Sequence, residues 1–272
     1  MNNTINTKLI SSLGFTMLIT GAPAALVSHY KFDEASGAST AVNEVVGGAG
    51  YDASVVGFVA TGLSGVAGNA YQFDGNGANH VILDNPAFAS AISTSQELTF
   101  SAWIKTSNGS GSTGIVGLGN KTTNDQYYQL STEGPEPRIV NRSATFHAYE
   151  SLQSINDDSW HHLVGTIRYD GTDTHLELYI DGVFDGGTIL TLDPPPNALN
   201  VMNIGVLART NGGSPQFADS YTGLIDDVQI YDEVLSASQI SYLYNNAGQA
   251  IPEPSVAVLS LGVLGLLARR RR

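Results

Sequence analysis

The most chemically suggestive acidic residue is Asp226, in the stretch from Gly223 to Tyr231. If this stretch is an alternating strand, Asp226 shares a face with Val228 and Ile230, so its carboxylate should be partly buried. A buried carboxylate needs a cation or hydrogen-bond donors. Calcium takes roughly six to eight oxygen ligands and is one candidate. The alternative is that Asp226 pairs with a nearby donor or caps a turn.

A second set of residues has the chemistry of a sugar site. Aromatic rings stack on pyranose rings, and arginine donates hydrogen bonds to hydroxyl groups or uronate carboxylates. The same residue types, gathered from separate strands, also suit a polysaccharide lyase, and they are equally compatible with ordinary strand surface. The residues are Tyr127, Tyr128, Arg138, Arg142 and His147.

The common signatures of hydrolytic enzymes are missing from the sequence. A glycosidase needs two carboxyl groups flanking the scissile bond, but the glutamates are scattered. There is no Gly-x-Ser-x-Gly, His-Glu-x-x-His or phosphate-binding glycine loop. We therefore expect no catalytic residues, with a polysaccharide-active enzyme as one alternative and a purely structural coat protein as the other.

The elements that would position these residues are mostly short strands. Residues 98–105 alternate apolar and polar with a period of two, as does much of the stretch from Trp160 to Phe184. Asp181-Gly182 predicts a two-residue hairpin turn. Ser236 is a good N-cap for one short helix ending at Asn245. The pattern predicts an all-β fold, a two-sheet antiparallel jelly-roll sandwich with one C-terminal helix.

Several motifs, in order, resemble the laminin-G-like, concanavalin A-like lectin/glucanase family. The resemblance implies a jelly-roll domain over residues 25–247, a carbohydrate or another surface component as ligand, and often one structural Ca²⁺. For that ion it suggests Asp33, Glu34 and Asn43 as partners of Asp226. The motifs are Phe73-Asp74-Gly75, Leu98–Lys105, Trp160–Val164, Leu178–Gly182, Gly223–Tyr231, Ser236-Ala237 and Gln239-Ile240.

Residues 1–24 have the layout of a secretory signal peptide. Lys8 is the only charged residue in this segment, Leu9 to Ala22 is mostly apolar, and Ala22-Pro23-Ala24 offers a cleavage site. The sequence has no cysteine, so stability must come from a packed core, with metal as a further contribution.

A second targeting pattern covers residues 248–272. Pro252, Glu253 and Pro254 precede an apolar run from Val256 to Ala268. A helix of that length rises about 20 Å, short of a bilayer core of roughly 30 Å, so we expect only transient membrane anchoring. Four arginines would keep the end of the chain in the cytoplasm. They are Arg269, Arg270, Arg271 and Arg272.

This tail resembles the PEP-CTERM sorting signal of Gram-negative bacteria. The resemblance implies an exosortase as processing partner and export to the cell surface or an extracellular polysaccharide matrix. Without Lys8, Glu253 and the four terminal arginines, the body keeps seven basic and 24 acidic residues, a formal charge of −17. Such a surface repels nucleic acid, so we expect no nucleic-acid partner.

Overall fold

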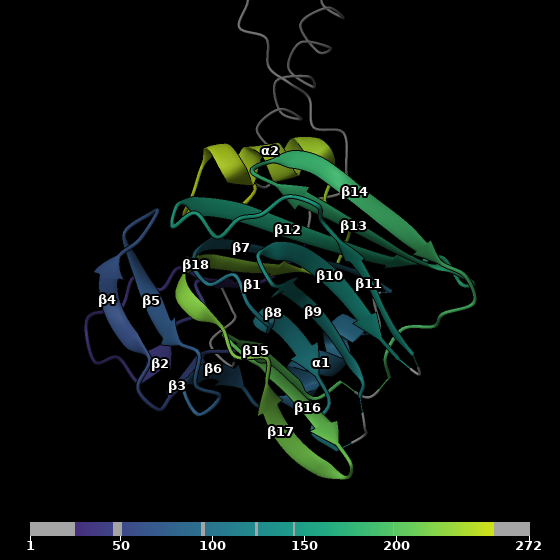
Figure 1. Cartoon of the computed structure of the whole chain (residues 1–272), viewed down its shortest axis with the longest axis horizontal. Coiled ribbons are helices and arrows are strands. Elements are labelled where there is room, and N and C mark those ends of the chain that lie inside the picture. Colours follow the sequence, from purple (N-terminus) through teal and green to yellow (C-terminus); the bar gives the residue numbers. More distant parts are fainter. Residues whose placement is uncertain are drawn as a thin grey trace, which may run out of the picture. The chain divides into compact units, whose positions relative to one another are not determined.

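The computed structural model describes residues 25–45, 51–93, 96–122, 125–143, 145–197 and 199–252. Their strands form two large antiparallel sheets (Figure 1). The first sheet has the order β14 (Val183–Leu190), β13 (Thr174–Ile180), β12 (Trp160–Tyr169), β7 (Glu97–Lys105), β18 (Thr222–Tyr231), β5 (Asn69–Asp74) and β4 (Ala60–Ser64), and β1 (Leu26–Tyr30) also pairs with β18.

The second sheet lies against the first. Its strands run in the order β11 (Phe146–Glu150), β10 (Glu136–Arg142), β9 (Tyr127–Glu133), β8 (Ser112–Gly119), β15 (Val201–Ile204), β6 (His80–Leu83), β3 (Ala53–Val56) and β2 (Thr40–Ala41). A separate hairpin is formed by β16 (Leu207–Asn211) and β17 (Ser214–Ala218). This is the two-sheet antiparallel sandwich that the strand pattern predicted.

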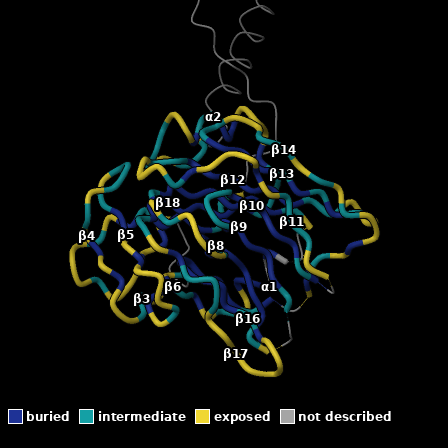
Figure 2. Tube along the Cα trace, viewed as in Figure 1, coloured by how far each residue is buried: buried dark blue, intermediate teal, exposed yellow. Residues whose placement is uncertain are grey.

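The core lies between the two sheets, where most of the strand residues are buried (Figure 2). Leu98, Phe100, Ala102 and Ile104 all face it, as their alternation predicted. The sheets approach closely at Gly165 of β12. A Cβ there would lie 2.5 Å from a methyl carbon of an isoleucine on β10, so a larger residue would force the sheets apart.

The predicted hairpin turn and C-terminal helix are both confirmed. Asp181 and Gly182 have φ of 51° and 77°, and they join β13 directly to β14. Helix α2 (Ala237–Asn245) begins after Ser236, whose side chain accepts from the Gln239 backbone in a capping box. Leu243 and its apolar neighbours on α2 pack against the face of the first sheet that points away from the core.

The elements that were not predicted include one helix and one hairpin. Helix α1 (Pro86–Ser93) begins where the Asn85 side chain accepts from the backbone of Ala87 and Phe88. Its eight residues are too few for a clear helical period. The strands of the β16–β17 hairpin were also missed, because only the loop from Gly212 to Ser214 stood out in the sequence. No helix among the described residues is long and apolar enough to cross a membrane.

Candidate ligand-binding face

Three neighbouring strands bring part of the predicted sugar site together. In register, Tyr127 of β9 pairs with Arg142 of β10, which pairs with Phe146 of β11. Arg138 lies four residues from Arg142 on β10, and alternation puts the two side chains on the same side of the sheet. These side chains point away from the first sheet, so they occupy the outer face of the second sheet.

The β16–β17 hairpin adds Arg209 to this face. Asp125, just before β9, links the hairpin to the sheet because its backbone N–H donates to the Thr210 carbonyl at 2.9 Å. Its carboxylate lies 2.7 Å from Arg142 Nη2 and 3.5 Å from Arg209 Nη1. We call Tyr127, Arg138, Arg142, Phe146 and Arg209, with their acidic neighbours Asp125, Glu133 and Asp219, the arginine face.

Ion pairs and ring contacts hold the arginines of β10 in place. Arg138 donates through Nε to Ser131 Oγ at 3.0 Å and pairs with Glu133 through Nη1. The guanidinium carbons of Arg138 and Arg142 lie 5.6 Å and 6.0 Å from the centre of the Phe146 ring. Phe146 keeps 39% of its surface exposed, so a sugar ring can reach it.

Burial shifts two ionisable groups on the face. Burial raises the pKa of the Tyr127 hydroxyl, although the charges of Arg142 and Arg209 act in the opposite direction. Burial likewise raises the pKa of the Asp219 carboxyl, against the favourable charges of Arg209 and Arg138.

Several buried polar atoms of this face have no hydrogen-bond partner in the protein. Gln129 and Asn203 stand on β9 and β15, on the outer side of the second sheet, and both are almost completely buried. Buried polar groups are normally satisfied, so these atoms are places where an ordered water can supply a partner. The atoms are Gln129 Nε2, Asn203 Nδ2 and Oδ1, Thr210 Oγ1, Arg142 Nε and Arg209 Nε.

Glycines of β8 let the hairpin lie directly on the sheet. A Cβ on Gly119 would be 1.9 Å from the carbonyl oxygen of Ala208, and one on Gly114 would be 2.8 Å from the backbone of Val206. We expect Gly119→Ala to destabilise the domain by about 1–3 kcal/mol, because the blocking atom is backbone. Urea unfolding would measure the loss. Ser214→Ala, at an exposed position of β17, is the control and should change stability by less than about 0.5 kcal/mol.

Two of the five predicted sugar-site residues lie on the opposite side of the second sheet. Tyr128 belongs to the core between the sheets. His147 pairs through Nδ1 with Asp193 at 2.9 Å, and Asp193 also accepts from the Asn141 and Ser143 side chains. Adjacent strand residues alternate in direction, so Tyr127 and Tyr128 cannot both face one ligand.

Sequence reasoning did not find Phe146, Asp125, Gln129, Asn203, Arg209 or Asp219. Arg209 lies 67 positions from Arg142, and nothing local in either segment predicts that they meet. One signal was available in the composition. The body between residues 25 and 251 has only seven basic residues, so each arginine there is a candidate for a specific role.

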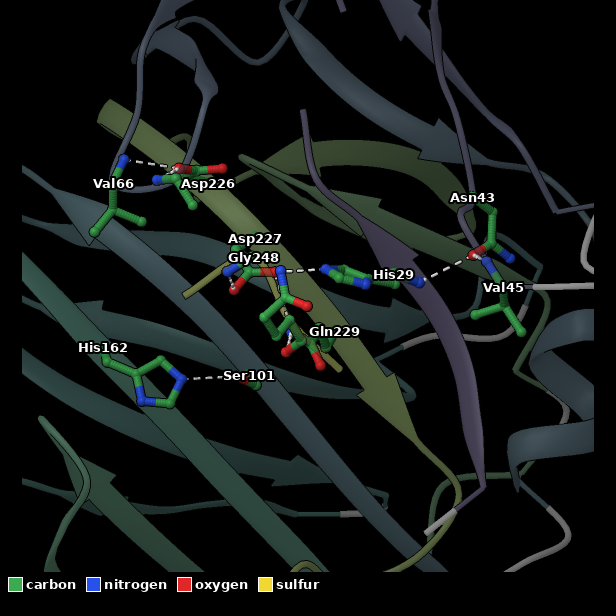
Figure 3. Close-up of polar contacts among 12 residues, drawn as sticks. His29, Asn43, Val45, Val66, Ser101, His162, Asp226, Asp227, Gln229 and Gly248 are labelled. Carbon is green, nitrogen blue, oxygen red and sulfur yellow. Dashed lines mark hydrogen bonds and ion pairs between the residues drawn. The ribbon is translucent and has the colours of Figure 1, made fainter. Parts of the chain in front are cut away.

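Asp226 is fully buried, whereas its position in an apolar strand predicted partial burial. Its Oδ2 accepts from the backbone of Val66 at 2.8 Å and Ala67 at 3.1 Å, while Oδ1 has no partner (Figure 3). Burial, reinforced by the charge of Asp227, raises the pKa of Asp226 to about 7. The strand register shifts after Asp226, so the simple alternation with Val228 is interrupted by a β-bulge.

The four residues suggested for calcium are only partly brought together. Asp33 and Asp226 flank one turn between β4 and β5: a Cβ on Gly68 would lie 1.9 Å from Asp33 Oδ1, and one on Gly65 2.4 Å from Asp226 Oδ2. Figure 3 places Asn43 apart from Asp226, beyond the His29–Asp227 pair.

The remaining side-chain oxygens are already engaged in hydrogen bonds. Asn43 Oδ1 accepts from the His29 backbone at 2.9 Å. Glu34 Oε1 and Oε2 accept from the Val42 backbone and the Tyr71 hydroxyl at 2.7 Å and 2.8 Å. Among the described residues, no three His, Cys, Asp or Glu side chains are placed to hold one ion. Asp226 and Asp33 are therefore the two carboxylates that fit a hard cation, with backbone carbonyls as the other possible ligands.

Glu34 and Asp33 also line an open cavity of about 240 Å³ together with Lys31, Val42 and Glu44. The predicted signal peptide at residues 1–24 lies outside the described residues. So does the sorting tail from Glu253 onwards, including Pro254 and the four arginines, while Pro252 is exposed at the end of the described chain.

Known proteins with a similar fold were found among solved structures. Domain 4 of AbnA, a GH43 extracellular arabinanase from Geobacillus stearothermophilus in complex with arabinotriose, has a TM-score of 0.58 and 21% identity, over 82% of this chain and 99% of that one. The CBM40 of a Ruminococcus gnavus IT-sialidase, bound to α2,3 sialyllactose, has a TM-score of 0.54 and 13% identity, over 64% and 96%. Botulinum neurotoxin type C, described with two ganglioside molecules, has a TM-score of 0.57 and 13% identity, over 81% and 51%. At these identities the likeness shows the fold.

The sequence relatives are much longer proteins, and this chain matches only a small part of each. A stretch of 104 residues, 38% of this chain, is 29% identical to the mouse protein "Sushi, von Willebrand factor type A, EGF and pentraxin domain-containing protein 1", and this chain spans 3% of it. A zebrafish adhesion G-protein coupled receptor V1 is 26% identical over 156 residues, with 54% of this chain and 2% of the receptor covered. Residues 74–241 match the laminin G family described as the concanavalin A-like lectin/glucanases superfamily, and since this match covers more than half of the 272 residues, the chain belongs to that family.

Proposed function

We propose that this domain binds carbohydrate, and that the arginine face is where it does so. The observation that carries the proposal is the exposed Phe146 ring beside the guanidinium groups of Arg138 and Arg142. An aromatic ring with nearby donors is the usual composition of a sugar site. Several proteins of the same fold were solved with, or described with, sugar ligands, which supports the same ligand class.

The test is affinity electrophoresis of the full chain in gels that contain single polysaccharides. We expect retardation by at least one polysaccharide, and at least tenfold weaker binding for Phe146→Ala, because stacking and the arginine contact are lost together. Phe58→Ala is the matched control, since Phe58 is 91% exposed and lies in the loop between β3 and β4, near the opposite edge of the second sheet from β11. Equal retardation of both variants would remove the arginine face from the proposal. Release of shorter sugars during incubation would instead identify an enzyme.

The rest of the functional hypothesis concerns the place of action. We propose an exported, non-catalytic protein of the surface or extracellular polysaccharide matrix of a Gram-negative bacterium. Its support is the arrangement of Pro252-Glu253-Pro254, the apolar run and the terminal arginines, together with the signal-like start. Loss of surface delivery on deletion of residues 252–272, in cells with and without an exosortase, would test this address.

A structural calcium ion at Asp226 and Asp33 is a further part of the proposal. Its support is the unpartnered Oδ1 of Asp226 and the position of both carboxylates around one turn. We expect Ca²⁺ at a hundredfold excess over its Kd to raise the unfolding free energy by about 2.7 kcal/mol relative to EGTA. The rise should vanish in Asp226→Asn and persist in Asp84→Asn, a surface carboxylate paired with Lys121. A wild-type domain that ignores Ca²⁺ would rule the ion out.

A further inference from the structure

The arginine face balances its three arginines with three acidic residues, whereas the rest of the body is strongly acidic. Three of the seven basic residues between positions 25 and 251 converge there, in a body with 24 acidic residues. We propose that the ligand of this face is an acidic polysaccharide, whose anionic groups are bound by Arg142 and Arg209. This inference rests on the proposed function and names the ligand class of the same site.

The two arginines are ion-paired with the same carboxylate, that of Asp125. Asp125 bonds Arg142 Nη2 at 2.7 Å through one oxygen, and its other oxygen lies 3.5 Å from Arg209 Nη1. The Nε atoms of both arginines are buried without a partner. Each guanidinium has five N–H donors, so both retain donors for a further anion. Their side chains remain 26% and 20% exposed, which lets a ligand reach them.

The third arginine is committed to the protein itself. Arg138 donates to Ser131 and pairs with Glu133, and its side chain is only 7% exposed. It therefore orients Glu133 and supports the face, while contact with the ligand falls to Arg142 and Arg209.

Phe146 gives the site its selectivity for a sugar over a free anion. Its ring lies 6.0 Å from the guanidinium carbon of Arg142, which fixes the guanidinium next to the surface on which a pyranose would stack. A polymer that carries both a ring and an anionic group can satisfy the aromatic and the arginine contacts together. Nonspecific electrostatic attraction would not explain binding of an acidic polymer, because the body as a whole is negatively charged and repels polyanions.

The test is affinity electrophoresis of the full chain in gels that each contain one of three polymers, at low and at moderate salt. Polygalacturonate carries carboxylates, dextran sulfate carries sulfate esters, and dextran is neutral. We expect an acidic polymer to bind, and the double variant Arg142→Gln, Arg209→Gln to bind it at least tenfold more weakly. Arg168→Gln, on β12 of the first sheet, is the matched control and should bind as the wild type does. Arg209→Lys keeps the charge and the fold but loses the planar fork, so intermediate binding is expected.

The outcomes separate the two proposals. Preference for polygalacturonate assigns a carboxylate-bearing glycan, and preference for dextran sulfate assigns a sulfated one; either supports the inference. Equal binding of dextran and the acidic polymers, unchanged in the double variant, overturns the acidic ligand but leaves carbohydrate binding intact. An equal loss in Arg168→Gln would show a general charge effect and also overturn it. If no polysaccharide binds at all, the proposed function fails as well.

Discussion

Replacing Asp227 with alanine should destabilise the domain by about 3–5 kcal/mol, the cost of leaving a buried charge and its donors unpaired. Asp227 is 2% exposed and lies 2.5 Å from His29 Nε2 (Figure 3). It also accepts from the Gln229 side chain at 3.0 Å and the Gly248 backbone at 2.7 Å. Burial alone would raise its pKa, but the hydrogen bond and charge of His29 lower it, so the carboxylate is ionised in the folded state.

Urea unfolding at neutral pH, followed by tryptophan fluorescence, measures this loss. Asp158→Ala is the matched control, because that aspartate is 68% exposed and should change stability by less than about 0.5 kcal/mol. A loss of under 1 kcal/mol for Asp227→Ala would mean that the network contributes little and that solvent can enter it.

Acidification should destabilise the domain through His162. Burial lowers the pKa of this histidine from 6.5 to about 4, against the opposing charges of Asp227 and Asp181. The unfolded chain therefore binds a proton between pH 6.5 and 4 that the folded domain does not. This contribution to stability is complete above pH 6.5 and decreases as the pH falls, by about 1.4 kcal/mol per pH unit and about 3 kcal/mol in total.

The variant His162→Gln isolates that contribution. Asp226 titrates with the opposite sign, because burial raises its pKa to about 7, so the difference between wild type and variant is the informative quantity. Glutamine can still bond to Ser101 Oγ, which lies 2.8 Å from His162 Nε2. The stability difference should shrink as the pH falls from 6.5 to 4. A difference independent of pH would show that His162 titrates normally. His175→Gln, a partly exposed histidine, is the control.

Much of the sandwich was predictable because local pattern and tertiary position agree. The residues of 98–105 that the alternation predicted to face inward all lie in the core. Asp181-Gly182 closes its hairpin with positive φ at both positions, which suits a two-residue turn between twisted strands. The pattern fails where a strand is irregular. The bulge after Asp226, with Asp227 at φ 47°, depends on β7 and β1 and leaves no sign in the sequence around it.

The candidate site was only half predictable for the same reason. Tyr127, Arg138 and Arg142 lie on neighbouring strands, so sequence distance was a fair guide to their contact. Arg209 belongs to a hairpin whose position depends on glycines of β8. Tyr128 was wrongly included because neighbouring residues of a strand point to opposite faces, which places it in the core. Long-range pairing is a property of the folded sheet order, which local spacing does not encode.

The two ends of the domain have a consequence for how it is displayed. Leu26 and Ile251 both pack on the α2 side of the first sheet, and the Ala25 carbonyl accepts from the Asp232 backbone. The arginine face belongs to the opposite side of the sandwich. A tether or fusion partner attached at either end of the domain would therefore lie on the side opposite the arginine face and would leave that face accessible to a ligand. Immobilised through its C-terminus on a bead, the domain should bind as well as it does in solution, whereas coupling through the β16–β17 hairpin should block it.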